Sequence, residues 1–155
     1  NVRQNVAMAS GVGRTPEERY EHAMEYVKLV GLEDYADLSP VELSTGMKQR
    51  LGLARVLASQ AEVLLMDEPF ASLDFLTRAE LQHQVLQLQQ KLPRTILLVT
   101  HQLDEALLLG QSITVMHPLG KTETFDLSHL SYPRDLENGE LKDLRRAVTE
   151  ACRKD

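Results

Sequence analysis

The chain has 155 residues, of which 43% are hydrophobic and 26% charged, and 17 Lys and Arg against 23 Asp and Glu give a formal net charge of −6. This suits one globular domain, and a net negative chain without a Lys/Arg run argues against a nucleic-acid partner held by phosphate contacts. Aliphatic runs of a few residues exclude a segment of the roughly 20 residues that cross a bilayer, and five scattered histidines with one cysteine exclude a structural zinc site.

Two helices are predicted in the first 60 residues. Thr15 can cap a helix that starts at Pro16, with Glu18 three residues after the cap. Apolar residues then recur at helical spacing, and Gly31 ends the pattern, which predicts a helix over 16–30. A second helix is expected to begin after Ser44.

Strand, helix and strand follow one another in the middle of the chain. The aliphatic run 63–66 predicts a strand, the apolar spacing over 76–91 predicts a helix stopped by Pro93, and 95–100 predicts the next strand. This spacing is typical of a parallel βαβ crossover, and the short aliphatic runs fit strands buried on both faces.

The last third of the chain is predicted to hold a hairpin between two helices. A helix over 103–109 is ended by Gly110, segments 112–117 and 121–127 flank a Pro-Leu-Gly turn, and apolar residues recur at helical spacing over 136–151.

Polar residues follow both predicted parallel strands, where ligands bind in open parallel sheets. Asp67 and Glu68 end the first strand. One such acid can hold Mg²⁺ and the other can orient or deprotonate a water molecule, although a solvated turn is an equally good interpretation of the dipeptide alone. His101 follows the second strand and could donate a hydrogen bond to a phosphate oxygen, although a lone histidine is more often a polar residue with an ordinary hydrogen-bond partner.

The start of the second helix is a candidate anion site. Ser44 is a good N-cap, and Gly46 in the first turn lets another surface approach the backbone amides. Unpaired N–H groups and the helix dipole favour a negative ligand there. Taken alone, Ser-x-Gly does not overturn the interpretation of this segment as an ordinary capped helix.

Together these segments resemble the ATP-binding-cassette (ABC) ATPases. The resemblance rests on four segments that occur in the same order as in the family. They are Leu-Ser-Thr-Gly-Met-Lys-Gln-Arg (43–50), Val-Leu-Leu-Met-Asp-Glu-Pro (63–69), Ser72-Leu73-Asp74 and Val99-Thr100-His101. It implies an α/β fold with the P-loop NTPase-like core of ABC ATPases, parallel strands with flanking helices, and a helical subdomain. Residues 1–60 would be that subdomain, 61–130 the carboxyl-terminal part of the catalytic core, and 131–155 a helical tail.

The resemblance also implies residue roles, with ATP and Mg²⁺ as ligands. Asp67 would bind Mg²⁺ through water, Glu68 would be the general base, and His101 would contact the γ-phosphate. Asp74 would link the two sites of a dimer. The signature segment, Ser44, Thr45, Gly46 and Met47, would cap a nucleotide held mainly by a second ATPase subunit in a head-to-tail dimer.

Two features depart from the family pattern. Thr45 replaces the usual first glycine of the signature, and Met47 stands where many members have glutamine. A helical φ at the first position accommodates the β-branched Thr45. The chain also contains no Gly-x-x-x-x-Gly-Lys-[Ser/Thr] loop. In this family, that loop and a glutamine loop, whose glutamine senses the γ-phosphate, precede the region seen here. We therefore expect a partial domain that is truncated after the glutamine loop and is inactive alone.

Within the family, residues 72–74 correspond to the segment called the D-loop. Glu-Pro-Phe before it and Leu-Thr-Arg after it resemble the importer ATPases, nearest the nitrate/sulfonate/taurine branch. This implies an ATP-hydrolysing subunit on the cytoplasmic face of the bacterial inner membrane, peripheral to it, with a permease as partner and a solute-binding protein as an indirect one. The expected cargo is a small solute, such as a nitrate-, sulfonate- or taurine-like anion.

Two other functions fit parts of the pattern. A soluble ABC-type ATPase of DNA repair or chromosome maintenance shares the signature and the acid pair, but such proteins carry coiled-coil heptads or zinc-binding cysteines, and the chain shows neither. A non-catalytic truncated interaction module is the third interpretation, against which the intact Asp67, Glu68 and His101 argue.

Overall fold

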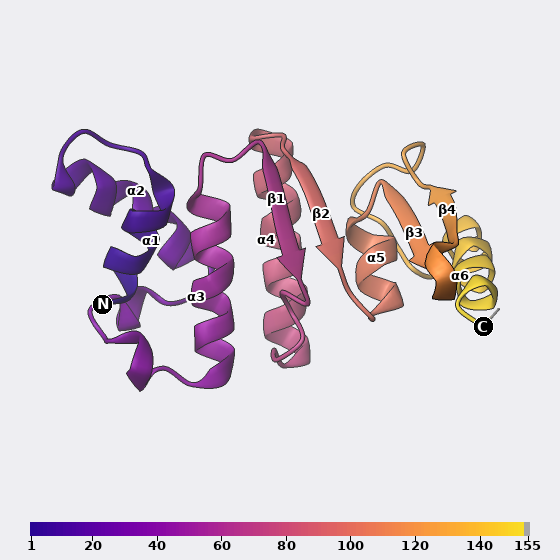
Figure 1. Cartoon of the computed structure of the whole chain (residues 1–155), viewed down its shortest axis with the longest axis horizontal. Coiled ribbons are helices and arrows are strands. Elements are labelled where there is room, and N and C mark those ends of the chain that lie inside the picture. The colour runs from indigo at the N-terminus through magenta and orange to yellow at the C-terminus, as the bar shows by residue number, and fades with distance from the viewer. Residues whose placement is uncertain (154–155) are drawn as a thin grey trace. The chain divides into compact units, whose positions relative to one another are not determined.

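A computed structural model describes residues 1–153, and their contacts group into two units, Asn1–Val99 and the part from Thr100 onward. The first unit holds helices α1 to α4 and strands β1 and β2, and the second holds α5, β3, β4 and α6 (Figure 1). None of the helices among the described residues is both long enough and apolar enough to cross a membrane.

The predicted crossover is present in the first unit. Strand β1 (Val63–Asp67) pairs in parallel with β2 (Thr95–Val99), and helix α4 (Phe75–Lys91) connects them (Figure 1). The register places Asp67 opposite Val99 at the carboxyl end of the sheet.

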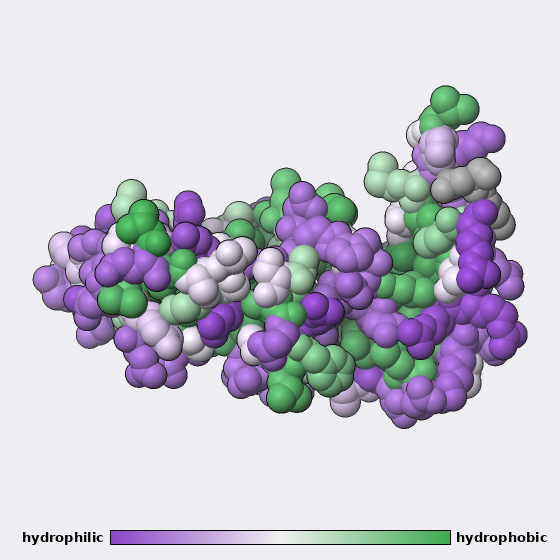
Figure 2. All heavy atoms as spheres, turned by 90° about the horizontal axis from the view of Figure 1, so that it is seen from below, coloured by the Kyte–Doolittle hydropathy of each residue, from purple (hydrophilic) through white to green (hydrophobic). Residues whose placement is uncertain are grey.

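The prediction that both faces of these strands are buried is wrong. Leu64 and Met66 are buried, whereas Val63 and Leu65 are exposed to 54% and 67%. On β2, Leu97 and Val99 are likewise exposed. The single helix of one crossover can cover only one face of a sheet, so the other stays open. Hydrophobic side chains do reach the molecular surface among hydrophilic ones (Figure 2).

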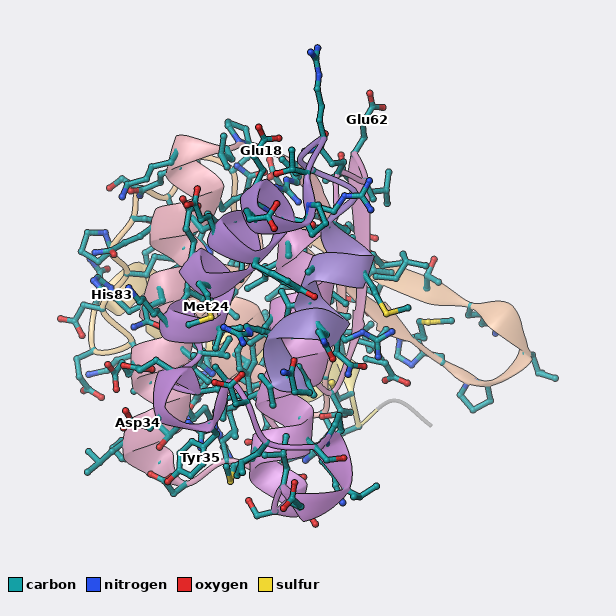
Figure 3. The ribbon with its side chains drawn as sticks, turned by 90° about the vertical axis from the view of Figure 1, so that its left-hand side faces the viewer. Glu18, Met24, Asp34, Tyr35, Glu62 and His83 are labelled. Carbon is teal, nitrogen blue, oxygen red and sulfur yellow. The ribbon has the colours of Figure 1, made fainter. Side chains whose placement is uncertain are left out.

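Helix α2 (Pro16–Leu29) begins where the sequence predicts. Thr15 caps it, and its hydroxyl accepts a hydrogen bond from the Glu18 backbone N–H at 3.2 Å. The Glu18 carboxylate reaches back to the Arg14 and Thr15 amides, at 2.7 and 3.4 Å, so this labelled side chain lies at the start of the helix (Figure 3). These reciprocal contacts are the predicted capping box.

Helix α1 (Val2–Ser10) was not predicted. Asn1 caps it by accepting from the Gln4 amide at 3.0 Å, and Gly11 ends it with a φ of 62°. Val2, Val6 and Ser10, spaced four residues apart, are fully buried.

Helix α3 (Thr45–Ala58) packs against both α1 and α2. Two short 3₁₀ helices, η1 (Glu33–Tyr35) and η2 (Pro40–Glu42), lie between α2 and α3 in the chain. The Arg50 guanidinium of α3 donates to the carbonyls of Val30 and Gly31 at 3.1 and 3.0 Å. This side chain therefore satisfies carbonyls at the end of α2 and ties α2 to α3.

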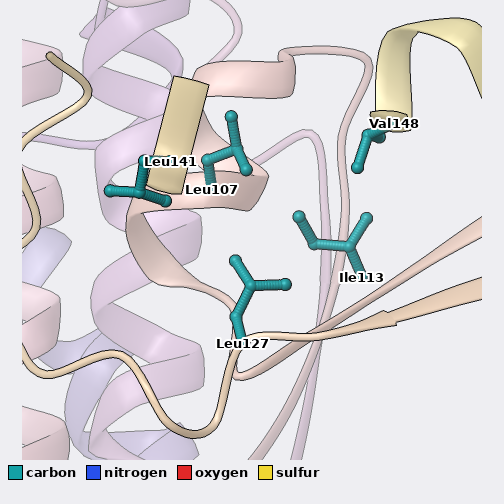
Figure 4. Packing of buried hydrophobic residues seen from close by; sticks show 5 residues of the cluster. All are labelled: Leu107, Ile113, Leu127, Leu141 and Val148. Carbon is teal, nitrogen blue, oxygen red and sulfur yellow. The ribbon is translucent and has the colours of Figure 1, made fainter. Parts of the chain in front are cut away.

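The second unit has its own core. Helix α5 (Leu103–Leu109), the antiparallel hairpin of β3 (Ser112–Met116) and β4 (Thr122–Asp126), and helix α6 (Gly139–Ala151) form it, and the 3₁₀ turn η3 (Pro118–Gly120) closes the hairpin. Five buried residues make the core shown in Figure 4: Leu107, Ile113, Leu127, Leu141 and Val148. The two helices and the antiparallel hairpin expected here are therefore confirmed.

Candidate functional site

The amino end of α3 carries the predicted anion-binding residues. Ser44 is the N-cap, and its Oγ accepts from the Met47 amide at 3.3 Å. The first intrahelical bond runs from the Lys48 amide to the Ser44 carbonyl at 2.9 Å, so the amides of Thr45 and Gly46 precede the hydrogen-bond ladder. Thr45 is the first helical residue, as expected. Ser44 and Thr45 are exposed, and this end of α3 can therefore present two N–H groups to a ligand.

Gly46 lies beside the segment that follows the acid pair. A Cβ at Gly46 would stand 3.4 Å from the Ser72 carbonyl oxygen and 3.9 Å from Leu73 Cδ2, both ordinary contact distances. Packing within this chain therefore does not by itself require glycine at this position.

The acid pair lies at the carboxyl end of β1. Asp67 is exposed and is the last residue of the strand, whereas Glu68 is half-buried and has a φ of +46°. The Glu68 amide donates to the Val99 carbonyl at 2.9 Å. Positive φ is uncommon for a residue with a Cβ and concentrates at functional positions. The backbone therefore leaves the strand conformation at Glu68.

Gln49 of α3 contacts the acid pair, and the sequence alone did not point to it as a site residue. Its side-chain Nε2 donates to the Glu68 carbonyl at 2.6 Å, and its Oε1 accepts from the Ser72 amide at 2.9 Å. Gln49 belongs to the segment 43–50 that resembles the ABC signature region, but its partners lie 19 and 23 residues further along the chain. Only the folded chain brings them together.

Asp74 caps helix α4. Its Oδ1 accepts from the Thr77 amide at 3.1 Å. Hydrogen bonding from Thr77 is the main reason why the pKa of the Asp74 carboxyl lies below 3.8. Asp74 therefore has a structural task in this chain, beside any contact with a second subunit.

His101 lies in the second unit, in a segment fixed by a buried acid. The Thr100 hydroxyl donates to Glu105 Oε2 at 2.7 Å and accepts from the Gln102 amide at 3.0 Å. The His101 ring is exposed, and its Nε2 lies 3.1 Å from Gln102 Nε2. Glu105 is only 3% exposed, so the chain on both sides of His101 is held by groups within α5 and its cap. Glu105 is a second residue whose contact with the site the sequence did not reveal.

The oxygen donors suit magnesium bound together with a substrate. Across residues 1–153, no group of three or more His, Cys, Asp or Glu is arranged to hold a metal ion. Mg²⁺ at phosphate-transfer sites typically uses one or two carboxylates, water and the substrate phosphates, so it needs no such cage. The exposed Asp67 carboxylate at the strand end fits that donor set.

The first unit thus gathers three of the predicted segments. Residues 44–47 begin α3, residues 67–68 end β1, and residues 72–74 lead into α4, with Gln49 and Gly46 as the contacts between them. His101, the fourth predicted feature, follows the end of β2 by two residues and belongs to the second unit.

The sequence of this chain is similar to those of known proteins. The profile of the ABC transporter family matches residues 1–71, which include the α3 start and the acid pair. The glycine betaine/carnitine transport ATP-binding protein GbuA of Listeria monocytogenes is 51% identical over 104 residues, 67% of this chain and 26% of that protein. The taurine import ATP-binding protein TauB of Rhizobium johnstonii is 44% identical over 121 residues, 76% of this chain and 45% of that protein. The chain belongs to the ABC transporter ATP-binding family.

The fold agrees with solved ABC cassettes. The dimeric ATP-binding cassette MJ0796 bound to ADP and Pi superposes with a TM-score of 0.73 at 27% identity, over 82% of this chain and 56% of that chain. A metal-chelate type ABC transporter matches in fold with a TM-score of 0.68 over 83% of this chain and 53% of that chain, at 21% identity. The mixed α/β, partial ABC cassette fold is therefore confirmed. This ABC chain spans about a quarter to half of the length of the curated relatives compared above.

Proposed function

We propose that this chain is the signature-bearing part of the ATP-hydrolysing subunit of an ABC importer. The observation that carries the proposal is the capped start of α3, which lies against Ser72 and Leu73 and is joined through Gln49 to the backbone of Glu68. The importer role is supported by the two relatives named above, a glycine betaine/carnitine transport ATP-binding protein and a taurine import ATP-binding protein.

The start of α3 would bind the γ-phosphate of a nucleotide held mainly by a second ATPase subunit. Ser44 Oγ already accepts from Met47 N–H, and a hydroxyl still has its own proton to donate to a phosphate oxygen. The amides of Thr45 and Gly46 add two donors at the positive end of the helix dipole. A head-to-tail dimer would bring this surface to the other subunit's nucleotide, and the dimeric structure of the MJ0796 cassette supports such an assembly.

Asp67 and Glu68 would divide the chemistry at the end of β1. Asp67 would hold Mg²⁺ through water, and the ion supplies positive charge that neutralises the phosphates when bound with ATP. Glu68 would orient the attacking water molecule and take its proton. His101 would donate a hydrogen bond to the γ-phosphate, and Asp74 would contact the second subunit from the start of α4.

The remaining parts of the proposal concern the whole protein. Residues 1–60 would form the helical subdomain that docks on a membrane permease, 61–130 part of the catalytic core, and 131–155 a tail. The subunit would work at the cytoplasmic face of a bacterial inner membrane, with a solute-binding protein as an indirect partner. Its cargo would be a small charged solute, the class of the taurine, glycine betaine and carnitine named for the relatives.

A chimera tests the proposal, because the chain contains no phosphate-binding loop of its own. The chain replaces the matched part of the Rhizobium taurine import protein, and the rest of that protein is kept. We expect the purified chimera to hydrolyse ATP with Mg²⁺, the 155-residue chain alone to show no turnover, and Glu68→Gln to lower the chimera's turnover by about 10²-fold or more.

The exposed Gln90→Glu serves as the control for this experiment. It should leave turnover unchanged. A folded chimera that does not hydrolyse ATP, or one in which Glu68→Gln and Gln90→Glu behave alike, would contradict the proposal.

A further inference from the structure

A single side chain joins the signature helix to two points of the segment that follows β1. The Gln49 carboxamide donates from Nε2 to the Glu68 carbonyl at 2.6 Å and accepts through Oε1 from the Ser72 amide at 2.9 Å. Only this orientation of the amide matches a donor with the carbonyl and an acceptor with the N–H. Both polar atoms of the half-buried Gln49 side chain are therefore used.

These bonds act on a residue in a disfavoured backbone conformation. Glu68 has a φ of +46°. Its amide is bound to the Val99 carbonyl at 2.9 Å, and its carbonyl accepts from the Ala71 amide at 3.2 Å as well as from Gln49. The peptide groups on both sides of Glu68 are thus fixed. A strained conformation of this kind persists only where surrounding contacts determine it.

The direction of the Glu68 side chain follows from this backbone. In a continued strand, successive side chains point to opposite faces, whereas a left-handed residue re-aims the side chain and turns the chain. The Gln49 bond to the carbonyl fixes the rotation of the peptide that leaves Glu68, and the Ser72 bond fixes where the turn ends. Gly46, one helical turn before Gln49 on α3, also lies near Ser72, since a Cβ there would stand 3.4 Å from the Ser72 carbonyl oxygen.

We propose that Gln49 is a positioning residue that sets the Glu68 carboxylate and couples any movement of the α3 start to the acid pair and to the segment before Asp74. Its importance for turnover rests on the proposed role of Glu68 as general base. Its effect on the conformation of Glu68 does not depend on that role.

Nuclear magnetic resonance on the full 155-residue chain tests the conformational effect. In the unaltered chain, a scalar coupling across the hydrogen bond should connect Gln49 Nε2 with the Glu68 carbonyl carbon. Gln49→Met removes both bonds, and the Ser72 amide should then exchange with solvent about five to ten times faster, with a shift in the Glu68 Cα and Cβ signals.

Gln49→Glu separates the two halves of the contact. A carboxylate can still accept from Ser72 N–H, but it places an oxygen against the Glu68 carbonyl. Ser72 exchange should therefore stay close to that of the unaltered chain while the Glu68 signals move. Gln90→Met and Gln90→Glu, at an exposed position of α4, are the matched controls and should change neither signal.

The chimera described above provides the functional readout. Gln49→Met should lower kcat about tenfold and leave KM for ATP within twofold, since the bonds of the residue are to the backbone of Glu68 and Ser72 and it would act through the base. An absent coupling together with unchanged Ser72 exchange and Glu68 signals in Gln49→Met would overturn the inference. An inactive unaltered chimera with the expected Glu68 and Ser72 changes would instead count against the proposed function alone.

Discussion

Replacement of Arg134 should loosen the second unit more than any other single surface substitution made there. The side chain stands in the loop between β4 and α6, where its guanidinium donates to four backbone carbonyls, of Leu107, Gly110, Leu127 and Leu130. It also lies 4.3 Å from the centroid of the Tyr132 ring. Burial lowers the pKa of the Arg134 guanidinium from its usual value, and the group remains charged at neutral pH.

The magnitude follows from these contacts. A hydrogen bond from a charged donor contributes about 1.5–3 kcal/mol when buried, and partial exposure reduces this to about 1 kcal/mol for each carbonyl. A cation–π contact contributes about 0.5–1 kcal/mol. Arg134→Met should therefore destabilise the second unit by about 4–5 kcal/mol. Arg134→Lys should destabilise the second unit by most of this amount, because an ammonium group cannot reproduce the planar fork of hydrogen-bond donors of the guanidinium.

Native-state hydrogen exchange measures the effect locally. The Leu127 amide, which donates to the Gln111 carbonyl at 2.8 Å, should exchange about 10³–10⁴-fold faster in Arg134→Met. Arg146→Met is the matched control, since Arg146 is largely exposed and makes one long ion pair with Asp143 at 3.7 Å. Equal Leu127 exchange in the two variants would refute the reasoning.

Three further outcomes are expected. Asp74→Ala should lower the thermal midpoint at neutral pH, and Asp74→Asn should lower it less, because Asn keeps the cap but not the charge. The deficit of the alanine variant should shrink as pH falls below 3.8, since a lowered pKa stabilises the fold above that value and its contribution disappears as the carboxyl is protonated. Phe70→Ala should cost about 3–5 kcal/mol in urea unfolding and Phe70→Leu much less, because Phe70 is 1% exposed. Glu105→Ala should cost about 1–3 kcal/mol and shift the imidazole signals of His101, because it removes the acceptor of the Thr100 hydroxyl.

Local signals in the sequence predicted most of the secondary structure. The Thr15 cap with Pro16 and Glu18 gave the start of α2, and Gly110 gave the end of α5. Such signals act within a few residues, so they can be recognised without knowledge of the fold. The aliphatic runs at 63–66 and 95–100 likewise predicted the two parallel strands to within one residue.

Features that depend on distant contacts escaped prediction. Helix α1 is only nine residues long, and it is held partly from outside by the Val2 and Arg3 amides, which donate to carbonyls of Leu38 and Ala36, both at 3.0 Å. One face of β1 and β2 is exposed because no other element covers it, and the aliphatic composition of the strands does not show which elements pack on the sheet. The Gln49 and Glu105 contacts require side chains to meet in the fold.

The features of the candidate site were likewise predictable where they depend on local sequence and unpredictable where they depend on distant contacts. Motif spacing located Ser44, Asp67 and His101 at a helix start and at strand ends, as the structure has them. The spacing could not reveal that Asp74 caps α4, nor that Glu68 adopts a left-handed backbone. These properties arise from hydrogen bonds formed after the chain has turned.

The most direct measurement of the central claim is ATP-driven dimerisation of the chimeric cassette, followed by sedimentation velocity. The Glu68→Gln chimera, which should retain ATP, is expected to form dimers when ATP is added. Adding Ser44→Arg should abolish them, because a long side chain would occupy the α3 start where the second subunit's phosphate is proposed to bind. The exposed Ser128→Arg should leave dimerisation unchanged. Dimers that persist with Ser44→Arg as fully as with Ser128→Arg would contradict the account.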